Sequence, residues 1–422
     1  MKLKIFIATY LLSFNLAMAQ KNLPTDYLSK EFHAARREAF RNLMPANSVA
    51  VIFSYPERVF SKDVNYVFHQ NPDLYYLSGY TETDAVLLIF KETQQKEGQQ
   101  YKELFFVRQR DSAREIWTGR RLGVEGTKIK LGFSQVFTGA AFEKFSVDIT
   151  QFSTVIYDDI PEDVKSNNSG FDLAGLFKTF KEKVNPPGRK ERELHRELMS
   201  IAQNASAANM KDLIAAEKKK AELNDEFQKN LLMNEFLNTT DTVSLTTLVA
   251  KIKAQKKWGT DIYNDITKEL REIKTPEELV LLRKSVKISG IAHTEVMKAV
   301  TPNMSEREAE GIHTYIHKRY GAEQEGYPPI VGAGGNACIL HYEENSALKL
   351  DNQLLLMDVA CEYHGYSADI TRTIPANGKF TAEQKAIYQL VYDAQDSVFK
   401  LCKEGTPFAA LNKKAREVLT EG

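Results

Sequence analysis

Apolar residues near the start of the chain recur first with helical spacing and then in short unbroken runs. Residues 32–43 place apolar and basic side chains on opposite sides of one amphipathic helix. Runs rich in Val, Ile, Leu and Phe follow at 48–54, 84–90 and 103–107, and such runs are typical of buried strands. This mixture of a helix and strands predicts an α/β domain over residues 27–170.

Charged residues become dense in the middle of the chain, between residues 171 and 270. The run Glu-Lys-Lys-Lys at 217–220 is one example, and Asn-Pro-Pro-Gly at 185–188 marks a break in the chain. Long stretches such as residues 191–237 otherwise have helical character. Because a charged helix face is usually a solvated one, we interpret residues 171–270 as a helical insertion and linker exposed to solvent.

Helix-start signals mark the last third of the chain, where a hydroxyl residue is followed three positions later by Glu or Gln and can form a capping box. These signals begin at Thr275, Ser305 and Thr381. Apolar runs at 330–340 and 353–360 predict strands, and a further helix begins near Ala409. Residues 271–422 are therefore predicted to form a second α/β domain.

The first part of the chain, residues 1–19, has the features of a secretory leader. A short basic stretch precedes the mostly apolar residues 5–16, and Ala-Met-Ala at 17–19 is a small-residue cleavage site. We predict that the mature protein begins near Gln20 and is exported, either to the periplasm or into the medium. No later segment has the ~18 consecutive apolar residues that a membrane-spanning helix needs, so none is expected.

Composition narrows the classes of partner. The 422 residues include 56 Lys and Arg and 56 Asp and Glu, so the formal net charge is zero. This balance gives no electrostatic reason to expect a nucleic acid or an anionic membrane as partner. The three cysteines are an odd number and too few for a disulfide framework, and we interpret them as mostly structural thiols.

Residues 354–375 combine an apolar strand, a polar turn and a second strand, with an aspartate on each arm. If a two-residue His-Gly turn forms at 364–365, Asp358 faces Thr371 and Asp369 lies diagonally on the same face of the hairpin. A four-residue turn gives a similar answer with different neighbours. Two carboxylates placed in this way repel each other. A divalent cation between them removes the repulsion, and oxygen ligands suit hard ions such as Mn²⁺.

The alternative is that Asp358 merely ends a strand and that Asp369 is a solvated turn residue. The run Leu-Leu-Leu-Met at 354–357 predicts burial on both faces of the strand, which argues against this alternative for Asp358. Spacing alone leaves both interpretations open.

Histidines offer further candidates. His341 follows an apolar run that precedes the strand of Asp358, and it could hydrogen-bond a substrate or a reacting oxygen. His313 and His317 are four apart on a predicted helix, but Thr314 stands where a zincin has Glu, so surface or packing roles are expected for both. His293 falls on an apolar stripe and is expected to be a satisfied core histidine.

Several of these segments resemble the creatinase and aminopeptidase P family, whose catalytic domain has the "pita-bread" fold. The matching residues are Ile-Val-Gly at 330–332, Cys-Ile-Leu-His-Tyr at 338–342, Leu-Met-Asp at 356–358 and Ala-Asp-Ile-Thr-Arg-Thr at 368–373. The N-terminal part is similar to the N-terminal domain of aminopeptidase P, through residues 68–80 and through Glu-Ile-Trp-Thr-Gly-Arg-Arg-Leu-Gly at 115–123. This second similarity separates the chain from methionine aminopeptidases.

In this family two Asp, one His and two Glu hold two metal ions, expected here to be Mn²⁺. The resemblance assigns Asp358 and Asp369 as the two Asp ligands. It places His341 near the metal-bound water and the substrate, and Tyr327 as a tyrosine close to the site. The family's His and two Glu ligands come later in the chain, and nothing after residue 378 matches them. We therefore expect a catalytic domain that is incomplete at its C-terminus.

The resemblance implies metal-dependent release of an N-terminal residue that precedes proline, from proline-containing peptides, by a homodimer or homotetramer. Two alternatives stay open. One is an Xaa-Pro dipeptidase (prolidase), and the other is a metal-free pseudoenzyme that binds peptides or proteins on the same fold. The 422-residue chain itself is expected to be inactive, because three of the five family ligands have no counterpart in it.

Overall fold

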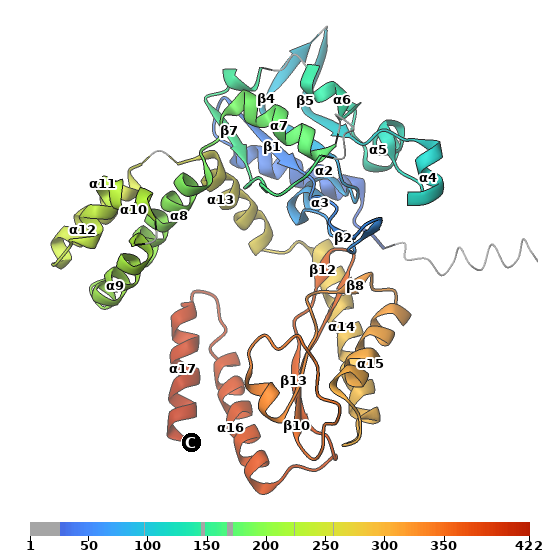
Figure 1. The fold of residues 1–422 in the computed structure, drawn as a ribbon, viewed down its shortest axis with the longest axis vertical. Helices are drawn as coiled ribbons and strands as arrows, with labels where there is room; N and C mark the ends of the chain where they lie inside the picture. Colours follow the sequence, from blue (N-terminus) through green and yellow to red (C-terminus); the bar gives the residue numbers. More distant parts are fainter. Residues whose placement is uncertain (1–25, 97, 145–147, 167–171, 223, 256) are drawn as a thin grey trace, which may run out of the picture. The chain divides into compact units, whose positions relative to one another are not determined.

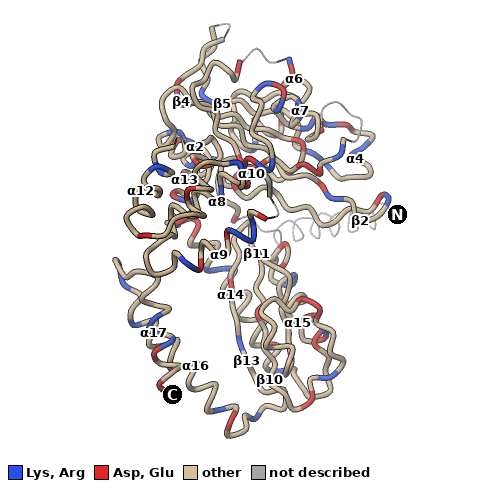
Figure 2. Tube along the Cα trace, turned by 60° about the vertical axis from the view of Figure 1, so that its left-hand side comes forward, with Lys and Arg blue, Asp and Glu red and all other residues tan. Residues whose placement is uncertain are grey.

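The computed structural model describes residues 26–422 apart from 97, 145–147, 167–171, 223 and 256 (Figure 1). The described chain divides into two compact units. One consists of residues 28–273, and the other of residues 274–422 together with Asp26 and Tyr27. The predicted leader lies outside the described residues. Both signs of charge are interspersed through each unit (Figure 2), and no described helix is long and apolar enough to cross a membrane.

A five-stranded mixed sheet forms the centre of the first unit, in the order β6-β5-β4-β1-β7. Neighbours β1 and β4, and β4 and β5, are antiparallel, whereas β5 and β6, and β1 and β7, are parallel. The strands are β1 (Ser48–Phe53), β4 (Val86–Lys96), β5 (Gln99–Val107), β6 (Val136–Thr138) and β7 (Thr154–Tyr157). The three apolar runs of the sequence thus form β1, β4 and β5, as predicted.

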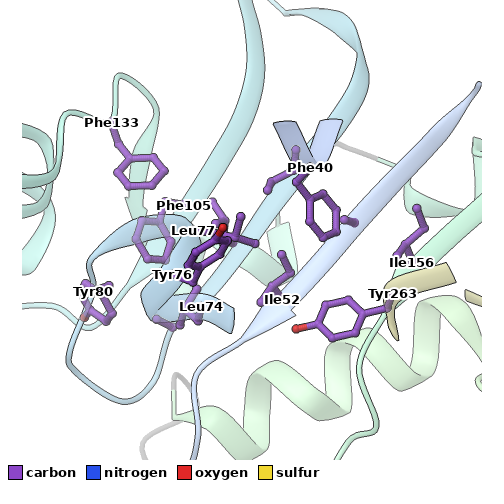
Figure 3. Packing of buried hydrophobic residues seen from close by; sticks show 14 of the residues in the cluster. Phe40, Ile52, Leu74, Tyr76, Leu77, Tyr80, Phe105, Phe133, Ile156 and Tyr263 are labelled. Carbon is purple, nitrogen blue, oxygen red and sulfur yellow. The ribbon is translucent and has the colours of Figure 1, made fainter. Parts of the chain in front are cut away.

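Helices cover both faces of this sheet. Ala50 and Ile52 of β1 face one core, which contains side chains from α2 (Lys30–Leu43), α3 (Pro72–Ser78) and α13 (Gly259–Glu272). Figure 3 shows Phe40, Ile52, Leu74 and Tyr263 converging in this core. The alternate residues of β1 face a second core, against α7 (Leu173–Val184). Burial on both faces explains why β1 is an unbroken apolar run.

Smaller elements complete the first unit. They are the hairpin β2 (Val59–Ser61) and β3 (Val64–Asn65), the helices α4 (Ser112–Thr118), α5 (Gly123–Leu131) and α6 (Ala140–Lys144), and the 3₁₀ turn η1 (Ile149–Gln151).

The charged middle segment is helical, as predicted, and much of it forms a small bundle. Its helices are α8 (Arg189–Asn204), α9 (Met210–Ala221), α10 (Asp225–Lys229), α11 (Leu231–Leu237) and α12 (Thr242–Lys253). They enclose a core of their own that includes Leu198, Met233, Phe236 and Leu248. Each helix of the bundle is amphipathic, so its charged residues cover a shared apolar interior, and this interior is what the sequence analysis did not predict.

In the second unit, two antiparallel helices pack beside two small sheets. The sheet orders are β13-β10-β9 and β12-β11-β8. The elements are α14 (Pro276–Ala299), α15 (Glu306–Arg319), β8 (Gln324–Glu325), β9 (Ile330–Ala333), β10 (Leu354–Asp358), β11 (Cys361–Tyr363), β12 (Tyr366–Ser367), β13 (Thr371–Pro375), α16 (Ala382–Phe399) and α17 (Phe408–Glu421). Capping boxes begin α14, α15 and α16 at the three predicted positions. The α/β class is therefore confirmed for both units.

Asp26 and Tyr27 belong to this unit through contacts at the tip of the β11–β12 hairpin. Asp26 accepts hydrogen bonds from Tyr363 Oη at 2.8 Å and from Lys284 Nζ at 2.7 Å. The Tyr27 ring stacks on the ring of His364 with a centroid separation of 3.6 Å. These contacts tie Asp26 and Tyr27 to the second unit.

The strand predicted at 330–340 ends early. Only Ile330–Ala333 is extended, and Gly334–Cys338 form the 3₁₀ turn η2. The turn folds back so closely that a Cβ on Gly332 would lie 2.9 Å from the backbone N of Ala337. Glycine permits this approach because it has no Cβ. The turn could not be predicted from periodicity, because apolar residues continue through it.

Candidate metal centre

The hairpin that carries Asp358 has the register predicted for a two-residue turn. Asp358 pairs with Thr371 in the β10–β13 ladder, and Tyr363 pairs with Tyr366 at the tip. The intervening residues are His364 and Gly365, with φ of 51° and 84°. Positive φ at both positions is the mark of a type I′ turn, whose twist matches that of the flanking strands.

Asp369 lies between β12 and β13, outside any regular strand, and is exposed. The prediction that Asp369 lies in a strand was therefore wrong. The strand register nevertheless continues through the three residues between β12 and β13. Val359 N donates to Ile370 O at 3.2 Å, and Ala368 N donates to Cys361 O at 3.4 Å. Asp369 therefore stands opposite Ala360, two positions beyond Asp358. Side chains two positions apart in a pleated ladder share a face.

Asp358 is half-buried, and its strand is buried on one face only. Leu355 and Met357 are fully buried against Val296 of α14 and its neighbours, whereas Leu354, Leu356 and Asp358 alternate with them and are half-buried. The prediction of burial on both faces was wrong, because only one face of β10 packs on that core. The other face carries Asp358 and is accessible to a ligand.

Tyr327 lies directly beside Asp358. Its Oη donates a hydrogen bond to Asp358 Oδ1 at 2.5 Å. Burial raises the pKa of Tyr327 above its usual range, and the adjacent carboxylates of Asp358 and Asp369 raise it further. The tyrosine thus stays protonated and acts as a donor. The structure brings Tyr327, Asp358 and Asp369 into one neighbourhood.

The donor set is compatible with a hard divalent cation. Within the described chain, neither Asp358 nor Asp369 has a Lys or Arg within salt-bridge distance, so their charges are not neutralised by the protein. Oxygen-only donors of this kind suit Mn²⁺, Mg²⁺ or Ca²⁺. However, no group of three or more His, Cys, Asp or Glu among the described residues is arranged to hold a metal ion.

His341 is not adjacent to a strand. It is exposed in the turn after η2. The loop around it is held by Glu306, a fully buried residue at the start of α15. Glu306 Oε1 accepts from Ala333 N at 2.7 Å and Asn336 Nδ2 at 3.0 Å, and Oε2 accepts from Tyr342 Oη and Ala347 N, both at 2.8 Å.

The role of Glu306 was missed in the sequence, where it appears only as the first residue after the Ser305 cap. Burial raises its pKa, but the hydrogen bonds to its two oxygens outweigh burial and hold the pKa below its usual value. Glu306 is therefore an anion that fixes the loop between β9 and β10, and with it the position of His341.

The other candidate histidines, His293, His313 and His317, lie in the interior of the second unit, where His317 Nδ1 also faces Glu325 Oε1 at 3.4 Å. His313 and His317 are fully buried, and the His313 ring contacts the His293 ring edge-on at 4.6 Å. His293 binds Val359 O through Nε2 at 3.0 Å, while its Nδ1 has no hydrogen-bond partner in the described chain. The expectation of a core residue is confirmed for His293, although only one of its ring nitrogens is satisfied.

Comparison with known proteins places these features in a family. The chain matches metallopeptidase family M24 over residues 280–422 and the aminopeptidase P N-terminal domain over residues 33–157. It is 30% identical to the Xaa-Pro aminopeptidase of Escherichia coli K12 over 395 residues, which cover 94% of this chain and 73% of that protein. The chain belongs to the aminopeptidase P family.

Other relatives and solved structures agree. The Xaa-Pro aminopeptidase of Haemophilus influenzae is 28% identical, with 93% of this chain and 71% of that protein covered. Zinc-substituted E. coli aminopeptidase P in complex with product is similar in structure, with a TM-score of 0.67, 27% identity, and coverage of 94% of this chain and 73% of that one. Membership of this family confirms the predicted fold. Because family M24 consists of metallopeptidases, it also implies that divalent metal ions take part in catalysis.

Proposed function

We propose that this protein hydrolyses the peptide bond between an N-terminal residue and a proline in second position, with Asp358 and Asp369 as metal ligands. The main support is the hairpin that sets both carboxylates on one face, in a chain that aligns with Xaa-Pro aminopeptidase over 94% of its length. The proposed metal is Mn²⁺, with two ions per complete site. When bound, such ions would lower the pKa of a coordinated water and so would supply hydroxide at neutral pH.

The residues of this chain would contribute binding and orientation. Tyr327 keeps its proton at Oη and holds one Asp358 oxygen, which leaves the other Asp358 oxygen and the Asp369 carboxylate for the cations. His341, in the loop fixed by Glu306, would donate to or accept from the substrate near the scissile bond. The Xaa-Pro bond has no N–H, so recognition has to rely on the free amine and the proline ring.

We also propose that the 422-residue chain has no measurable peptidase activity alone. Two carboxylates do not fix two cations around a shared water, and the family's His and two Glu ligands have no counterpart after residue 378. The test compares this chain with a version extended through any reading frame that follows Gly422 in the gene. Release of glycine from Gly-Pro-Xaa peptides is measured with Mn²⁺ and with a chelator.

The expected result is chelator-sensitive release by the extended version only. Similar rates from both versions would show that other residues complete the site. Cleavage of Gly-Pro but not Gly-Pro-Xaa would favour the prolidase alternative, and no cleavage by either version, with peptide binding retained, would favour the pseudoenzyme. Asp351→Asn is a matched control, because Asp351 is an exposed turn residue with φ of 49°, a conformation that Asn tolerates.

A further inference from the structure

A cavity opens at one end of the sheet in the first unit, well separated in sequence from the metal hairpin. Strands β1 and β7 are parallel neighbours, with Val51 paired to Tyr157, so their carboxyl ends lie at the same edge. The chain continues into Tyr55 after β1 and into Asp158 after β7, and both residues line a cavity of about 940 Å³. The region beyond the carboxyl ends of parallel strands is a common place for ligands.

Aromatic side chains form much of the wall of this cavity. They are Tyr55, Tyr66, Phe68 and His69. Tyr66 follows the β2–β3 hairpin and is 57% exposed, and an edge-on contact with Phe60 at 5.1 Å holds its ring. Aromatic faces carry negative partial charge and attract cations.

Carboxylates line the same cavity, and all but one of them already have a cation from the chain. Arg58 binds Asp163 through two nitrogens, at 2.6 and 3.1 Å. The other pairs are Asp159 with Arg192 and Arg196, at 3.2 and 2.7 Å, and Glu57 with Arg121 and Arg108, at 3.8 and 4.0 Å. Asp158 is the exception.

Asp158 is half-buried and has no Lys, Arg or His within 4.0 Å in the described chain. The hydrogen bond it accepts comes from the backbone N of Asp159, at 2.7 Å. The neighbouring carboxylate of Asp73 is itself bound by the guanidinium of Arg271, at 2.7 Å. Burial is the main cause that raises the pKa of Asp158 to about 6, and the neighbouring carboxylates of Asp73 and Asp159 contribute to this rise. A carboxylate in this setting is stabilised by an external cation.

We propose that this cavity binds a lysine or arginine side chain of a peptide, with Asp158 as the counter-charge and the rings of Tyr55, Tyr66 and Phe68 as the surrounding wall. A carboxylate combined with aromatic faces is the chemistry that recognises ammonium and guanidinium groups. The volume is that of a site for a ligand of many atoms, which favours a peptide side chain with its flanking backbone over a small free amine. None of these residues belongs to the proposed metal site.

The test measures binding to the full 422-residue chain by isothermal titration calorimetry. The probe is Nα-acetyl-lysine amide, which keeps the side-chain ammonium, and Nα-acetyl-norleucine amide is its uncharged analogue. Asp158→Asn removes the charge with little change of shape, and Asp63→Asn is the matched control, an exposed residue of the β2–β3 hairpin that does not line the cavity. We expect saturable binding of the lysine probe, weakened about tenfold or more by Asp158→Asn and less than about twofold by Asp63→Asn.

Binding should also weaken between pH 7 and pH 5, because protonation of Asp158 removes the counter-charge, whereas Arg58 and Lys165, which also line the cavity, stay positively charged. Asp158→Asn should keep or raise the melting temperature at pH 7, since it removes a half-buried charge that has no partner, and this separates a binding site from a structural role. Equal binding of the norleucine analogue, an unaltered affinity in Asp158→Asn, or no saturable binding of the lysine probe would overturn the proposal. Because the readout is binding, the outcome is independent of peptidase activity.

Discussion

Replacing Glu306 by Gln should destabilise the second unit strongly, although the two side chains have the same shape. The two carboxylate oxygens accept four hydrogen bonds, two of them from the backbone N–H groups of Ala333 and Ala347. The other two come from Asn336 and Tyr342. A carboxylate accepts at both oxygens, whereas an amide accepts at one and donates at the other.

The magnitude follows from the geometry. Whichever way the amide introduced by Glu306→Gln is turned, its NH₂ group faces one backbone N–H that cannot reverse its direction. The Asn336 amide can flip and the Tyr342 hydroxyl can rotate, so one buried donor is left without an acceptor. An unsatisfied buried donor costs about 1–3 kcal/mol. The remaining hydrogen bonds also weaken because they lose the negative charge, which costs about 1 kcal/mol. We therefore expect Glu306→Gln to lower the free energy of unfolding of the second unit by about 2–4 kcal/mol at pH 7.

Hydrogen exchange is the appropriate assay. Both tryptophans, Trp117 and Trp258, lie in the first unit, so their fluorescence does not report on the second. Protection of amides in β9, β10 and α15 should fall by the equivalent of about 2–4 kcal/mol. The control is Glu308→Gln, at an exposed residue of the same helix that forms the capping box with Ser305. It should change protection by less than about 0.5 kcal/mol, because Gln also forms this box.

The pH dependence has a definite sign. The pKa of Glu306 is lowered in the folded state, so its contribution is fully present above the pKa of the unfolded chain, near 4.5, and is lost as the pH falls through the folded-state pKa. The difference between the wild-type chain and Glu306→Gln should therefore shrink below about pH 4. A Glu306→Gln chain with wild-type protection at pH 7 would refute the reasoning.

Two further predictions concern export and association. Material recovered from the periplasm or the medium should begin near Gln20 by N-terminal sequencing, and recovery of an intact Met1 form in the cytoplasm would contradict export. The α16 face is exposed at Ile387 (63%) and Val391 (55%), and such apolar patches favour self-association or partner binding. The double variant Ile387→Lys and Val391→Lys should therefore bind less of an apolar dye and reduce self-association in light scattering, and unchanged dye binding and mass would argue against this face.

The parts of the fold that could be predicted from the sequence depend on local signals. The His-Gly turn fixed the hairpin register, because a two-residue turn allows only one pairing of the flanking strands. The helix starts at Thr275, Ser305 and Thr381 could also be predicted, because a capping box is complete within four residues.

The parts that could not be predicted depend on contacts between distant residues. Glu306 binds Ala347, 41 positions away, and nothing near Glu306 in the sequence marks that contact. The turn at η2 depends on the close approach of Gly332 to Ala337, which apolar periodicity does not reveal. The helical character of the middle segment was predicted, but the core of its bundle was not, because the apolar stripes of these helices are buried only by one another. Among the candidate site residues, Asp358 and Asp369 could be placed on one face because the strand register determines their positions. The position of His341 could not be predicted, because it depends on the loop that Glu306 holds.

The metal assignment is tested most directly by titrating Mn²⁺ into the 422-residue chain and counting free ions by electron paramagnetic resonance. We predict weak, saturable binding to the wild-type chain, reduced about tenfold or more by either Asp358→Asn or Asp369→Asn and unaltered by Asp351→Asn. Equal Mn²⁺ binding by the wild-type chain and both hairpin variants would contradict the assignment of this hairpin as the metal centre.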